Sequence, residues 1–469
     1  MRKIVSFLIL ISSLFFLSTT CPPEPAEKKT PKNIIIFVGD GMGFNHIDVA
    51  SIYLHGDTGK FVFQGKNWSR FAQATYPAML KVGNQPEWAQ GYNPHAAWNE
   101  KGYLEKDHTD SGAGGTTLST GLKTYRGSIG MGIYGDTLLH LSQYAKQLGK
   151  AAGVVSSVQF THATPASFTT HNLHRNNYAQ IAQSMILKSQ LDVIMGAGNP
   201  DYDNSGEPLA QDYKYVGGKE LWNQLRTKPN STTFLIKKER FNVGDINGDG
   251  VPDPWTFISD SANFAALSAG INIPKRVLGL PRVHSTLQQG RSGSLQTEPF
   301  KQPRVSGVPT LEQMTLGALN VLNQNEKGFF LMVEGGAIDW ASHDNHSGRM
   351  IEEMDDFVSS IEAAVKWIEK NSNWDETLII ITADHETGML WGPADGNNLL
   401  TPIVNKGKGI LPGLQWHSID HTNSLVPLFL RGKGSDMISI FLDEFDPVRG
   451  PFVQNAEVAN LAFLLWGRF

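Results

Sequence analysis

Five short runs of apolar residues recur along this chain, and they constrain its fold more than any other feature. They cover residues 33–38 (NIIIFV), 152–158 (AGVVSSV), 193–195, 329–333 (FFLMV) and 378–382 (LIIIT). Such continuous runs are typical of strands that are buried on both faces, as in parallel sheets. Helical periodicity lies between them, at residues 138–148, 178–188, 310–322 and 350–369. This alternation predicts an α/β chain, a three-layer α/β/α sandwich around a large, mostly parallel sheet.

Polar residues of metal-binding types follow four of these runs. They are Asp40 after the first run, Thr164 soon after the second, Glu334 after the fourth, and Asp384 and His385 after the fifth. Ligands of parallel sheets bind outside the carboxyl ends of the strands, so we expect these side chains to meet at one edge. A single acid at a strand end is most often a cap or turn residue. Several such residues, from four strands, favour a binding site.

Residues 108–121 (HTDSGAGGTTLSTG) place Ser111 where a loop enters a helix-compatible, glycine-rich segment. Small residues let the backbone approach a ligand closely. A helix start offers free N–H groups and the positive end of the helix dipole, which suit an anion such as phosphate and favour a serine alkoxide. By itself the stretch fits a surface turn equally well. The other polar residues make Ser111 the candidate nucleophile.

Further residues fit three metal sites. Asp339 and His343 are four residues apart, so one helical turn presents both to one point. Either His417 or His421 completes a set of one carboxylate and two imidazoles, which suits catalytic zinc. The two other sets are Asp40 with Asp384 and His385, again mixed, and Asp40 with Thr164 and Glu334, all oxygen, which suits magnesium. Two zinc ions about 4 Å apart are the usual clamp for phosphoryl displacement.

An arginine completes the candidate site. Arg175, in HNLHRNN, has a guanidinium fork that matches two phosphate oxygens. An arginine in a polar stretch is more often a surface charge, so this role needs further support.

Residues 199–304 interrupt the alternation of strands and helices. The region is rich in Gly, Pro, Asn and Lys, and we interpret it as an insertion or cap. Within it, residues 245–253 (DINGDGVPD) carry oxygen side chains in the spacing of a calcium loop, at Asp245, Asn247, Asp249 and Asp253. Thr256 stands where such a loop has glutamate, so a solvated turn is the alternative.

The amino terminus has the features of an export signal. Arg2 and Lys3 precede an apolar run at 4–17, which predicts a signal peptide over residues 1–20. Residues 21–31 have the composition of a tether, and 32–469 form the catalytic domain. Cys21, the only cysteine, suggests a lipid anchor, with a freely secreted or periplasmic protein as the alternative. We therefore expect the protein in the periplasm or at the outer surface.

The net charge limits the partners that the protein is expected to bind, and the cysteine content limits the sources of its stability. A net charge of −5 gives no reason to expect a nucleic acid as partner. A single cysteine excludes an intrachain disulfide, so stability must come from the core and from bound metals.

The motifs together resemble the alkaline phosphatase family. The matching segments are FVGDGMG, HTDSGAGGTTLSTGLKTYRGSIG, THATPASF, LMVEGGAIDWASH, ITADHETG and DHTNSLVPLF, in the family's order over nearly all of the mature chain. The resemblance implies an α/β/α sandwich that hydrolyses phosphate monoesters at alkaline pH through a phosphoserine. It also implies two zinc ions and one magnesium ion. Relatives are often dimers, so a homodimer is an expectation.

The resemblance assigns a role to each residue. Ser111 is similar to the nucleophile, and Asp40 to the carboxylate between zinc and magnesium. Asp384 and His385 would complete that zinc site. Asp339, His343 and His421 would bind the other zinc, and His421 fits the family's motif better than His417. Thr164 and Glu334 would bind magnesium, and Arg175 would bind phosphate.

Three features depart from some branches of the family. His162 stands where one bacterial branch of the family has an acid near magnesium. The animal and some marine bacterial enzymes also have histidine at this position. Histidine should weaken the preference for magnesium, so another metal could share that site. Trp340 replaces a lysine or histidine close to the phosphate, which should loosen product phosphate and raise turnover where release is limiting. The disulfides of some bacterial relatives are missing.

Two other functions are alternatives. A phosphodiesterase or sulfatase of the same superfamily is the nearer alternative, but Ser111 lacks the Cys/Ser-x-Pro-x-Arg context of sulfatases, and a diesterase would be expected to lack Arg175. The other is a non-catalytic calcium-binding surface lipoprotein, which the presence of every expected ligand argues against.

Overall fold

The computed structural model describes residues 30–210, 212–228, 230–294 and 298–468. The predicted signal peptide, Cys21 and nearly all of the tether lie outside these ranges, so their roles stay predictions. Among the described residues, no helix is both long and apolar enough to cross a membrane.

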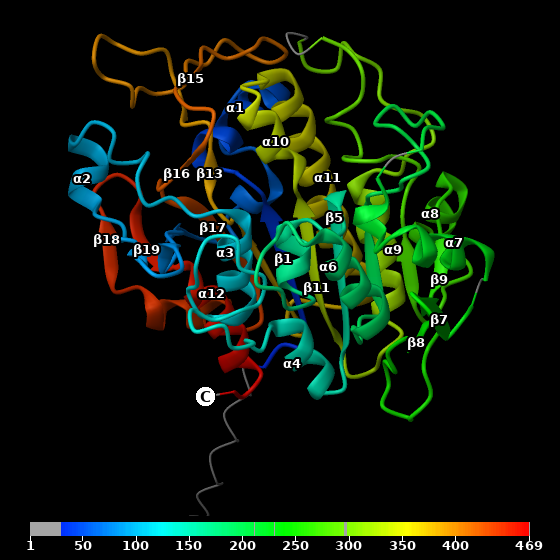
Figure 1. The fold of residues 1–469 in the computed structure, drawn as a ribbon. Coiled ribbons are helices and arrows are strands. Elements are labelled where there is room, and N and C mark those ends of the chain that lie inside the picture. Colours follow the sequence, from blue (N-terminus) through cyan, green and yellow to red (C-terminus); the bar gives the residue numbers. More distant parts are fainter. Residues whose placement is uncertain (1–29, 211, 229, 295–297, 469) are drawn as a thin grey trace, which may run out of the picture.

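A single large sheet runs through the part of the chain that the structure describes (Figure 1), in the order β18-β19-β2-β17-β12-β1-β11-β5-β6-β10-β9. Its eleven described strands are β1 (Asn33–Gly39), β2 (Ser69–Ala74), β5 (Ala151–Gln159), β6 (Val193–Ala197), β9 (Thr256–Ile258), β10 (Val277–Gly279), β11 (Phe329–Gly335), β12 (Thr377–Thr382), β17 (Val426–Gly432), β18 (Glu444–Asp446) and β19 (Gly450–Gln454). The strands from β12 to β9 are all parallel, and β17 is antiparallel to both of its neighbours. The predicted mostly parallel sheet is confirmed.

Helices cover both faces of the sheet. The α-helices are α1 (Phe44–His55), α2 (Pro94–Asn99), α3 (Ser111–Thr120), α4 (Leu141–Gln147), α5 (Ala163–Ser167), α6 (Tyr178–Gln183), α7 (Lys219–Thr227), α8 (Ser261–Ser268), α9 (Leu311–Leu322), α10 (Ala337–His343), α11 (Ser347–Asn371) and α12 (Asn455–Leu465). Short 3-10 turns are η1 (Val62–Gln64), η3 (Tyr213–Val216) and η4 (Ser435–Phe441), and η2 (Ser184–Lys188) is a π-helical turn. Small two-stranded sheets pair β3 (Met79–Lys81) with β4 (Glu87–Trp88), β7 (Thr233–Ile236) with β8 (Glu239–Asn242), β13 (Glu386–Thr387) with β16 (His421–Thr422) and β14 (Leu390–Trp391) with β15 (Gln415–Trp416).

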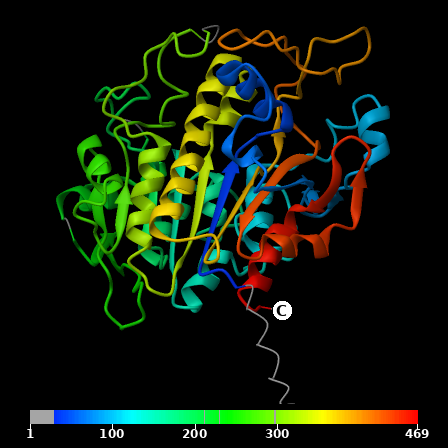
Figure 2. The same cartoon turned by 180° about the vertical axis from the view of Figure 1, so that it is seen from behind.

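Alternating side chains of the central strand show why there are three layers. On β1, Ile35 and Phe37 pack into the core shared with α1, α9 and α11, which cover the face turned to the viewer in Figure 2. Ile34 and Ile36 pack into the opposite core, with α3, α4, α6 and α12. Because successive residues of a strand point to opposite faces, an apolar run without polar alternation buries both. The predicted α/β/α sandwich is confirmed.

The helical patterns match helices with small differences at their ends. The patterns at 310–322 and 350–369 correspond to α9 and α11. The pattern at 178–188 forms α6 and continues as the π-helical turn η2. The pattern at 138–148 yields only α4, because the side chain of His140 accepts the N–H of Gln143 and caps the helix there.

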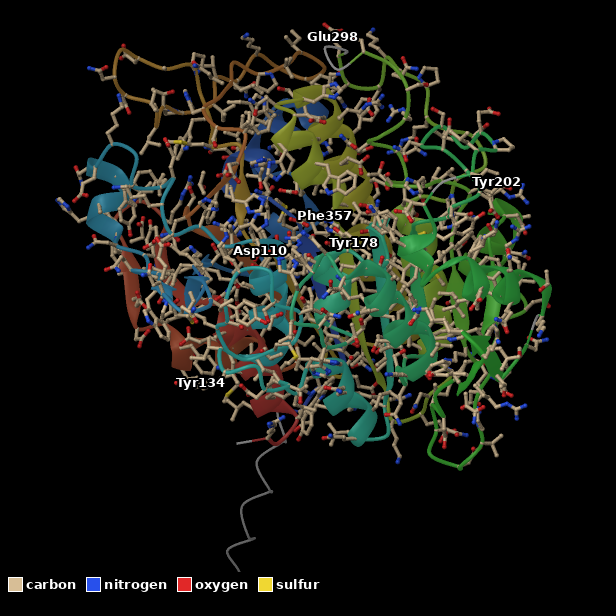
Figure 3. All side chains as sticks on the ribbon, viewed as in Figure 1. Asp110, Tyr134, Tyr178, Tyr202, Glu298 and Phe357 are labelled. Carbon is tan, nitrogen blue, oxygen red and sulfur yellow. The ribbon has the colours of Figure 1, made fainter. Side chains whose placement is uncertain are left out.

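The region predicted as an insertion contributes to the sheet as well as lying over it. Its short strands β9 and β10 extend the parallel edge beyond β6. The rest forms loops, α7, α8 and the β7–β8 hairpin, and Tyr202 and Glu298 mark two of its outer loops in Figure 3. At three residues each, β9 and β10 are too short for an apolar run to reveal them.

A buried ion-pair network fastens one of these loops to α11. Arg291 and Arg349 both donate to Glu352 Oε2, at 2.6 and 3.1 Å, and all three side chains are at most 4% exposed. Glu352 Oε1 accepts the backbone N–H of Phe300 at 2.7 Å. Glu352 therefore anchors both ends of the segment from Arg291 to Phe300.

Replacing this anchor should destabilise the fold. Glu352→Ala leaves two buried guanidinium groups without their carboxylate, so we expect the free energy of unfolding to fall by about 3–5 kcal/mol in urea denaturation. Glu369→Ala is the matched control, because Glu369 pairs with Arg431 but is 52% exposed; its cost should stay below about 1 kcal/mol. Equal costs for the two variants would contradict this prediction.

Candidate active site

Ser111 is the first residue of α3, at the loop-to-helix junction that the sequence predicts. Its side chain is buried, and Oγ lies 3.4 Å from His385 Nε2 and 3.4 Å from an Arg175 NH group. The expected free N–H groups are partly taken, because the carboxylate of Asp110 caps the helix and accepts the N–H groups of Gly112 and Ala113. The polar groups near Ser111 are therefore mainly side chains, because Asp110 already binds two of the helix N–H groups.

Glycines in α3 allow the helix to approach the neighbouring strand ends. A Cβ atom at Gly114 would lie 3.0 Å from the carbonyl oxygen of Asp384, and one at Gly115 would lie 3.2 Å from the Cα of Thr164. Real Cβ atoms rarely come so close to backbone. The small residues after Ser111 thus let one helix contact the loops that carry two predicted ligands.

Arg175 is held beside Ser111 by Asp110. An Arg175 NH group donates to Asp110 Oδ2 at 2.8 Å, and the other lies 3.3 Å from His162 Nε2. Burial acts to raise the pKa of Asp110, but Arg175 and the N–H groups of Gly127 and Ala113 outweigh it and lower that pKa to about 2. Asp110 lies near the centre of the view in Figure 3. It is a fixed anion that orients the arginine, a role the sequence reading missed, although an acid before a helix is a recognised cap signal.

Asp339, His343 and His421 form a compact triangle. His343 Nε2 is 3.1 Å from His421 Nε2, and both lie near Asp339 Oδ1, at 3.4 and 3.5 Å. Ligand atoms around a tetrahedral zinc ion at about 2.0 Å are about 3.3 Å apart, so this spacing suits zinc. His417, the other candidate, is in none of the clusters found among the described residues.

Backbone carbonyls set the tautomers of these imidazoles. His343 Nδ1 is 2.6 Å from the carbonyl oxygen of Ile419, and His421 Nδ1 is 2.8 Å from that of Thr109. A carbonyl only accepts, so each Nδ1 carries the proton and each Nε2 lone pair faces Asp339. This arrangement is typical of histidines that bind metal.

Asp40, Asp384 and His385 form a second cluster at the ends of β1 and β12. His385 Nε2 lies 3.5 Å from Asp40 Oδ1 and 3.3 Å from Asp384 Oδ2, and none of the three side chains is exposed. Both oxygens of Asp40 and Oδ2 of Asp384 lack a hydrogen-bond partner among the described residues. The ring of His385 stacks on that of His421 at 3.6 Å, so the first two clusters adjoin.

The third cluster contains Glu334, Thr164 and again Asp40. Ligand atoms of Asp40, Glu334 and His162 lie within 4.8 Å of one another. Glu334 Oε1 and Thr164 Oγ1 are buried without a hydrogen-bond partner in the described structure. Ser156, on β5, donates its hydroxyl to the other oxygen of Glu334 and is a neighbour that the sequence reading missed.

These carboxylates are electrostatically unfavourable without a cation. Burial and the nearby carboxylates raise the pKa of Asp384 to about 8 and that of Asp40 well above its usual value. Burial likewise raises the pKa of Glu334 to about 7. Buried polar atoms normally have partners, and buried charges are paired or bind metal. The unpaired oxygens and neutral imidazoles therefore fit two mixed nitrogen–oxygen cation sites and one oxygen-rich site.

Thr387, which the sequence reading did not single out, links the first two clusters. Its hydroxyl donates to Asp339 Oδ1 at 2.6 Å and lies 3.2 Å from His385 Nδ1. Because its proton goes to Asp339, the hydroxyl accepts from His385, which leaves His385 Nε2 free to face Ser111. The short β13–β16 ladder pairs Thr387 with His421 and fixes this arrangement. The only sequence signal is its position two residues after His385.

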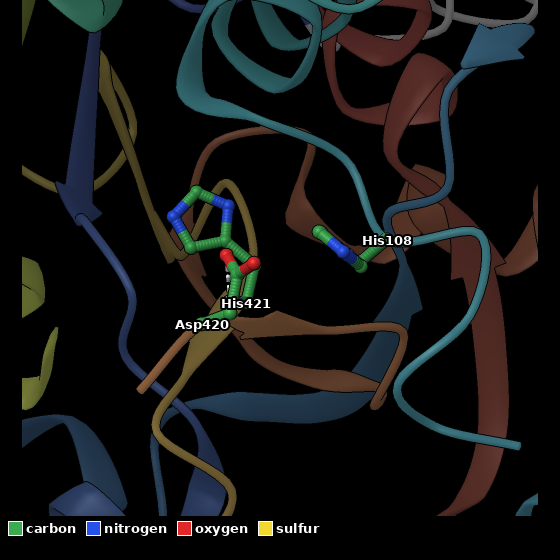
Figure 4. Close-up of side chains that lie close together, drawn as sticks. All are labelled: His108, Asp420 and His421. Carbon is green, nitrogen blue, oxygen red and sulfur yellow. Dashed lines mark hydrogen bonds between the residues drawn. The ribbon is translucent and has the colours of Figure 1, made fainter. Parts of the chain in front are cut away.

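His108 and Asp420 extend the cluster outward. Figure 4 shows the ring of His108 across a gap from Asp420 and His421, with ligand atoms within 4.8 Å. Asp420 Oδ1 accepts the backbone N–H of His421 at 2.8 Å. Nδ1 of His421 already binds the carbonyl oxygen of Thr109, and its Nε2 belongs to the triangle with Asp339 and His343. We therefore interpret His108 and Asp420 as residues that hold the His421 side chain in place.

Not every predicted residue joins the site. Asp245 accepts the N–H groups of Asn247, Gly248 and Gly250, and Asp253 pairs with Lys275 at 2.6 Å. Calcium binding there stays a prediction.

Trp340 packs edge-on against His162, with 5.6 Å between ring centroids. Both residues line the same cleft as Ser111 and Arg175, which has a volume of about 740 Å³.

Comparison with known proteins points to one family. Its profile, described as alkaline phosphatase, matches residues 31–409. Alkaline phosphatase 4 of Bacillus subtilis is 31% identical over 79% of this chain, and the match spans 64% of that relative's length. The cold-active alkaline phosphatase of Shewanella sp. is 26% identical, and its structural alignment covers 93% of this chain and 100% of the Shewanella chain, with a TM-score of 0.62. The alkaline phosphatase of the Antarctic bacterium TAB5 has the same fold, with a TM-score of 0.61, 22% identity, and coverage of 94% of this chain and 98% of its own.

The bridging hydroxyl of Thr387 generates a prediction. In Thr387→Val the shape is kept, but Asp339 and His385 lose their shared partner, so we expect zinc affinity to fall about 10–100-fold in chelator competition. Thr120→Val is the control, because Thr120 is buried in α3 and its hydroxyl bonds only backbone groups, the carbonyl oxygen of Thr116 and the carbonyl oxygen and N–H of Leu122. Unchanged zinc affinity in Thr387→Val would show that the link has no effect on the site.

Proposed function

The chain belongs to the alkaline phosphatase family, and on that premise we propose that it hydrolyses phosphate monoesters with Ser111 as the nucleophile. The single observation that carries the proposal is the convergence on Ser111 of unpaired carboxylates, neutral imidazoles and one arginine. Ser111, Arg175, Asp339, His343 and His421 line one cleft. The buried groups at the strand ends, Asp40, Glu334, Asp384 and His385, lie beside them, with His385 in contact with both Ser111 and His421. Such a set can bind cations and a phosphoryl group together, which a turn or a helix cap does not require.

The residues divide into three proposed cation sites. Asp339, His343 and His421 would hold one zinc ion, and Asp40, Asp384 and His385 the other. Thr164 and Glu334, with Asp40, would hold magnesium, and His162 stands close enough to modify that site. When bound, these ions would favour the alkoxide form of Ser111, activate water and neutralise charge on the phosphoryl group.

The proposed reaction has two displacements. Ser111 Oγ attacks phosphorus, the bond from phosphorus to the ester oxygen breaks, and the alcohol leaves with a proton from solvent. Water then attacks the phosphoserine, the Ser111–phosphorus bond breaks, and inorganic phosphate leaves. Through both steps Arg175 donates to non-bridging phosphate oxygens, while Asp110 keeps its guanidinium oriented.

A phosphodiesterase is the alternative that this arrangement does not favour. A diester has only two non-bridging oxygens and carries a second group near Arg175, whereas a monoester offers three. Rates with p-nitrophenyl phosphate and bis(p-nitrophenyl) phosphate separate the two functions, and a clear preference for the bis-ester would overturn the proposal.

Removal of the nucleophile should separate catalysis from metal binding. We expect Ser111→Ala to lower kcat on the order of 10³–10⁶-fold while the zinc and magnesium content stays near that of the wild type. Steady-state kinetics and elemental analysis of the same preparations measure both. Ser119→Ala is the control, since Ser119 lies in the same helix but bonds only the carbonyl oxygens of Thr116 and Ser167. Wild-type turnover in Ser111→Ala would disprove the assignment.

Metal removal should destabilise the protein more at higher pH. The raised pKa values of Asp384 and Glu334, about 8 and about 7, add stability to the metal-free fold that is lost as pH rises through 7–8. Bound cations remove this loss because they neutralise the carboxylates. We expect the stability difference between metal-loaded and chelator-treated protein to widen by about 1–2 kcal/mol from pH 6.5 to 8.5. Melting curves at both pH values measure it, and a constant difference would contradict the proposed ligands.

A further inference from the structure

The cleft above Ser111 has an outer part that phosphate chemistry does not require. Ser111 and Arg175 lie in its inner part. Its outer lining comes from two sides, Asn204 and residues 289–291 on one, and Trp340, Asp344 and Asp420 on the other. Ser111 is buried whereas Asp344 and Asp420 are exposed, so an alcohol that extends from a phosphate at Ser111 toward solvent would pass this outer part. Its chemistry should therefore decide which alcohols fit.

The side formed by residues 289–291 offers no available cation, although it contains an arginine. Arg291 donates through Nε to the carbonyl oxygen of Pro303 and through its other nitrogens to those of Gln288 and Gln302 and to Glu352. Its guanidinium is only 2% exposed in that pairing. Arg291 is therefore buried with all three of its nitrogens already donating, so it is not available to bind an anionic alcohol in the cleft.

The opposite side is negative. Asp344 and Asp420 are exposed at the cleft, and neither has an Arg or Lys partner among the described ion pairs. Asp344 Oδ2 accepts from the amide of Gln289 at 3.3 Å, so the two sides meet across the opening. The only arginines or lysines among the lining residues are Arg175, at the phosphate end, and the paired Arg291.

The wall is held in place by its own hydrogen bonds. Asn204 Oδ1 accepts the backbone N–H of Ser285 at 2.8 Å, and the N–H of Gly290 donates to Thr286 Oγ1 at 2.7 Å. A Cβ atom at Gly290 would lie 2.9 Å from Asn204 Nδ2, so the two residues pack closely and the side chain of Asn204 would have to shift for a larger residue. At the other end of residues 289–291, Glu352 holds Arg291 in place. The polar groups that an alcohol meets are thus fixed before it binds.

We propose that this outer part is a leaving-group subsite, formed by Asn204, Gln289, Asp344 and Asp420, that selects phosphate esters of cationic alcohols, such as amino alcohols, over esters of anionic alcohols. The inference rests on the proposed monoester hydrolysis and names its substrate class. The cleft is cationic at the phosphate end and anionic at the alcohol end. That polarity is complementary to a phosphate ester with a positive tail and repels one with a negative tail.

Two esters of equal length test the polarity. 2-Aminoethyl phosphate and phosphoglycolate share a two-carbon alcohol and differ in the charge of its end. At pH 8 and low ionic strength we expect kcat/KM to be about tenfold higher for the cationic ester, and this ratio to fall in 0.5 M salt. The esters of the two alcohols differ in intrinsic reactivity. The test therefore depends on how the ratio of their kcat/KM values changes with salt and between variants, and not on its absolute value.

Two nearly isosteric variants should move the ratio in opposite directions. Asp344→Asn removes a carboxylate, and we expect the ratio to fall about three- to fivefold. Asn204→Asp keeps the acceptor for Ser285 and adds a carboxylate, so the ratio should rise by a similar factor. Asp375→Asn is the control: it removes the same charge from an exposed site before β12, at the opposite edge of the sheet, and should leave the ratio unchanged.

Each outcome separates this inference from the proposed function. Hydrolysis of p-nitrophenyl phosphate with a ratio between the two esters that stays constant or rises in 0.5 M salt would overturn the subsite and leave the phosphatase intact. The same ratio in Asp344→Asn, Asn204→Asp and wild type would also overturn it. Failure to hydrolyse any monoester would instead overturn the proposed function.

Discussion

Repulsion among buried carboxylates is the constraint on which this structure depends. Asp40, Asp384 and Glu334 converge where no donor among the described residues satisfies either oxygen of Asp40, Oδ2 of Asp384 or Oε1 of Glu334. Burial and mutual repulsion raise all three pKa values, so this corner of the fold opposes its own ionisation. The neutral imidazoles beside them add lone pairs, not counter-charges. A chain keeps such an arrangement when cations bind it, and the proposed metal sites follow from this imbalance.

The parallel sheet is what brings these groups together. Asp40, Glu334 and Asp384 lie at the carboxyl ends of three adjacent strands, β1, β11 and β12, so neighbouring strands place the acids side by side. The glycines of α3 then let Ser111 approach them, since larger residues would collide with the Asp384 and Thr164 backbone. Sheet topology thus sets the spacing of the carboxylates, and the composition of α3 sets the distance of Ser111 from them.

Outside this centre, supporting residues divide the cleft into two chemical regions. Asp110 holds Arg175 toward the phosphate, and Thr387 holds Asp339 and His385 in register. Farther out, Glu352 holds Arg291 in a buried ion pair, whereas Asp344 and Asp420 are exposed at the opening. None of these three supports follows a long apolar run. Each acts by fixing or cancelling a charge on a residue nearer the reaction, which is why the polarity of the cleft depends on the whole arrangement.

The printed chain alone was enough to predict the layers, the principal strands and the residues that meet at their ends. Apolar runs specify buried strands, and parallel strands end at one edge, so Asp40, Glu334 and Asp384 could be grouped before any coordinates. Preference for His421 over His417 came only from family resemblance. The roles of Asp110, Thr387, Ser156 and Gln289, and the strands β9 and β10, needed the folded chain. Their partners lie far away in sequence, and periodicity and spacing report only local order.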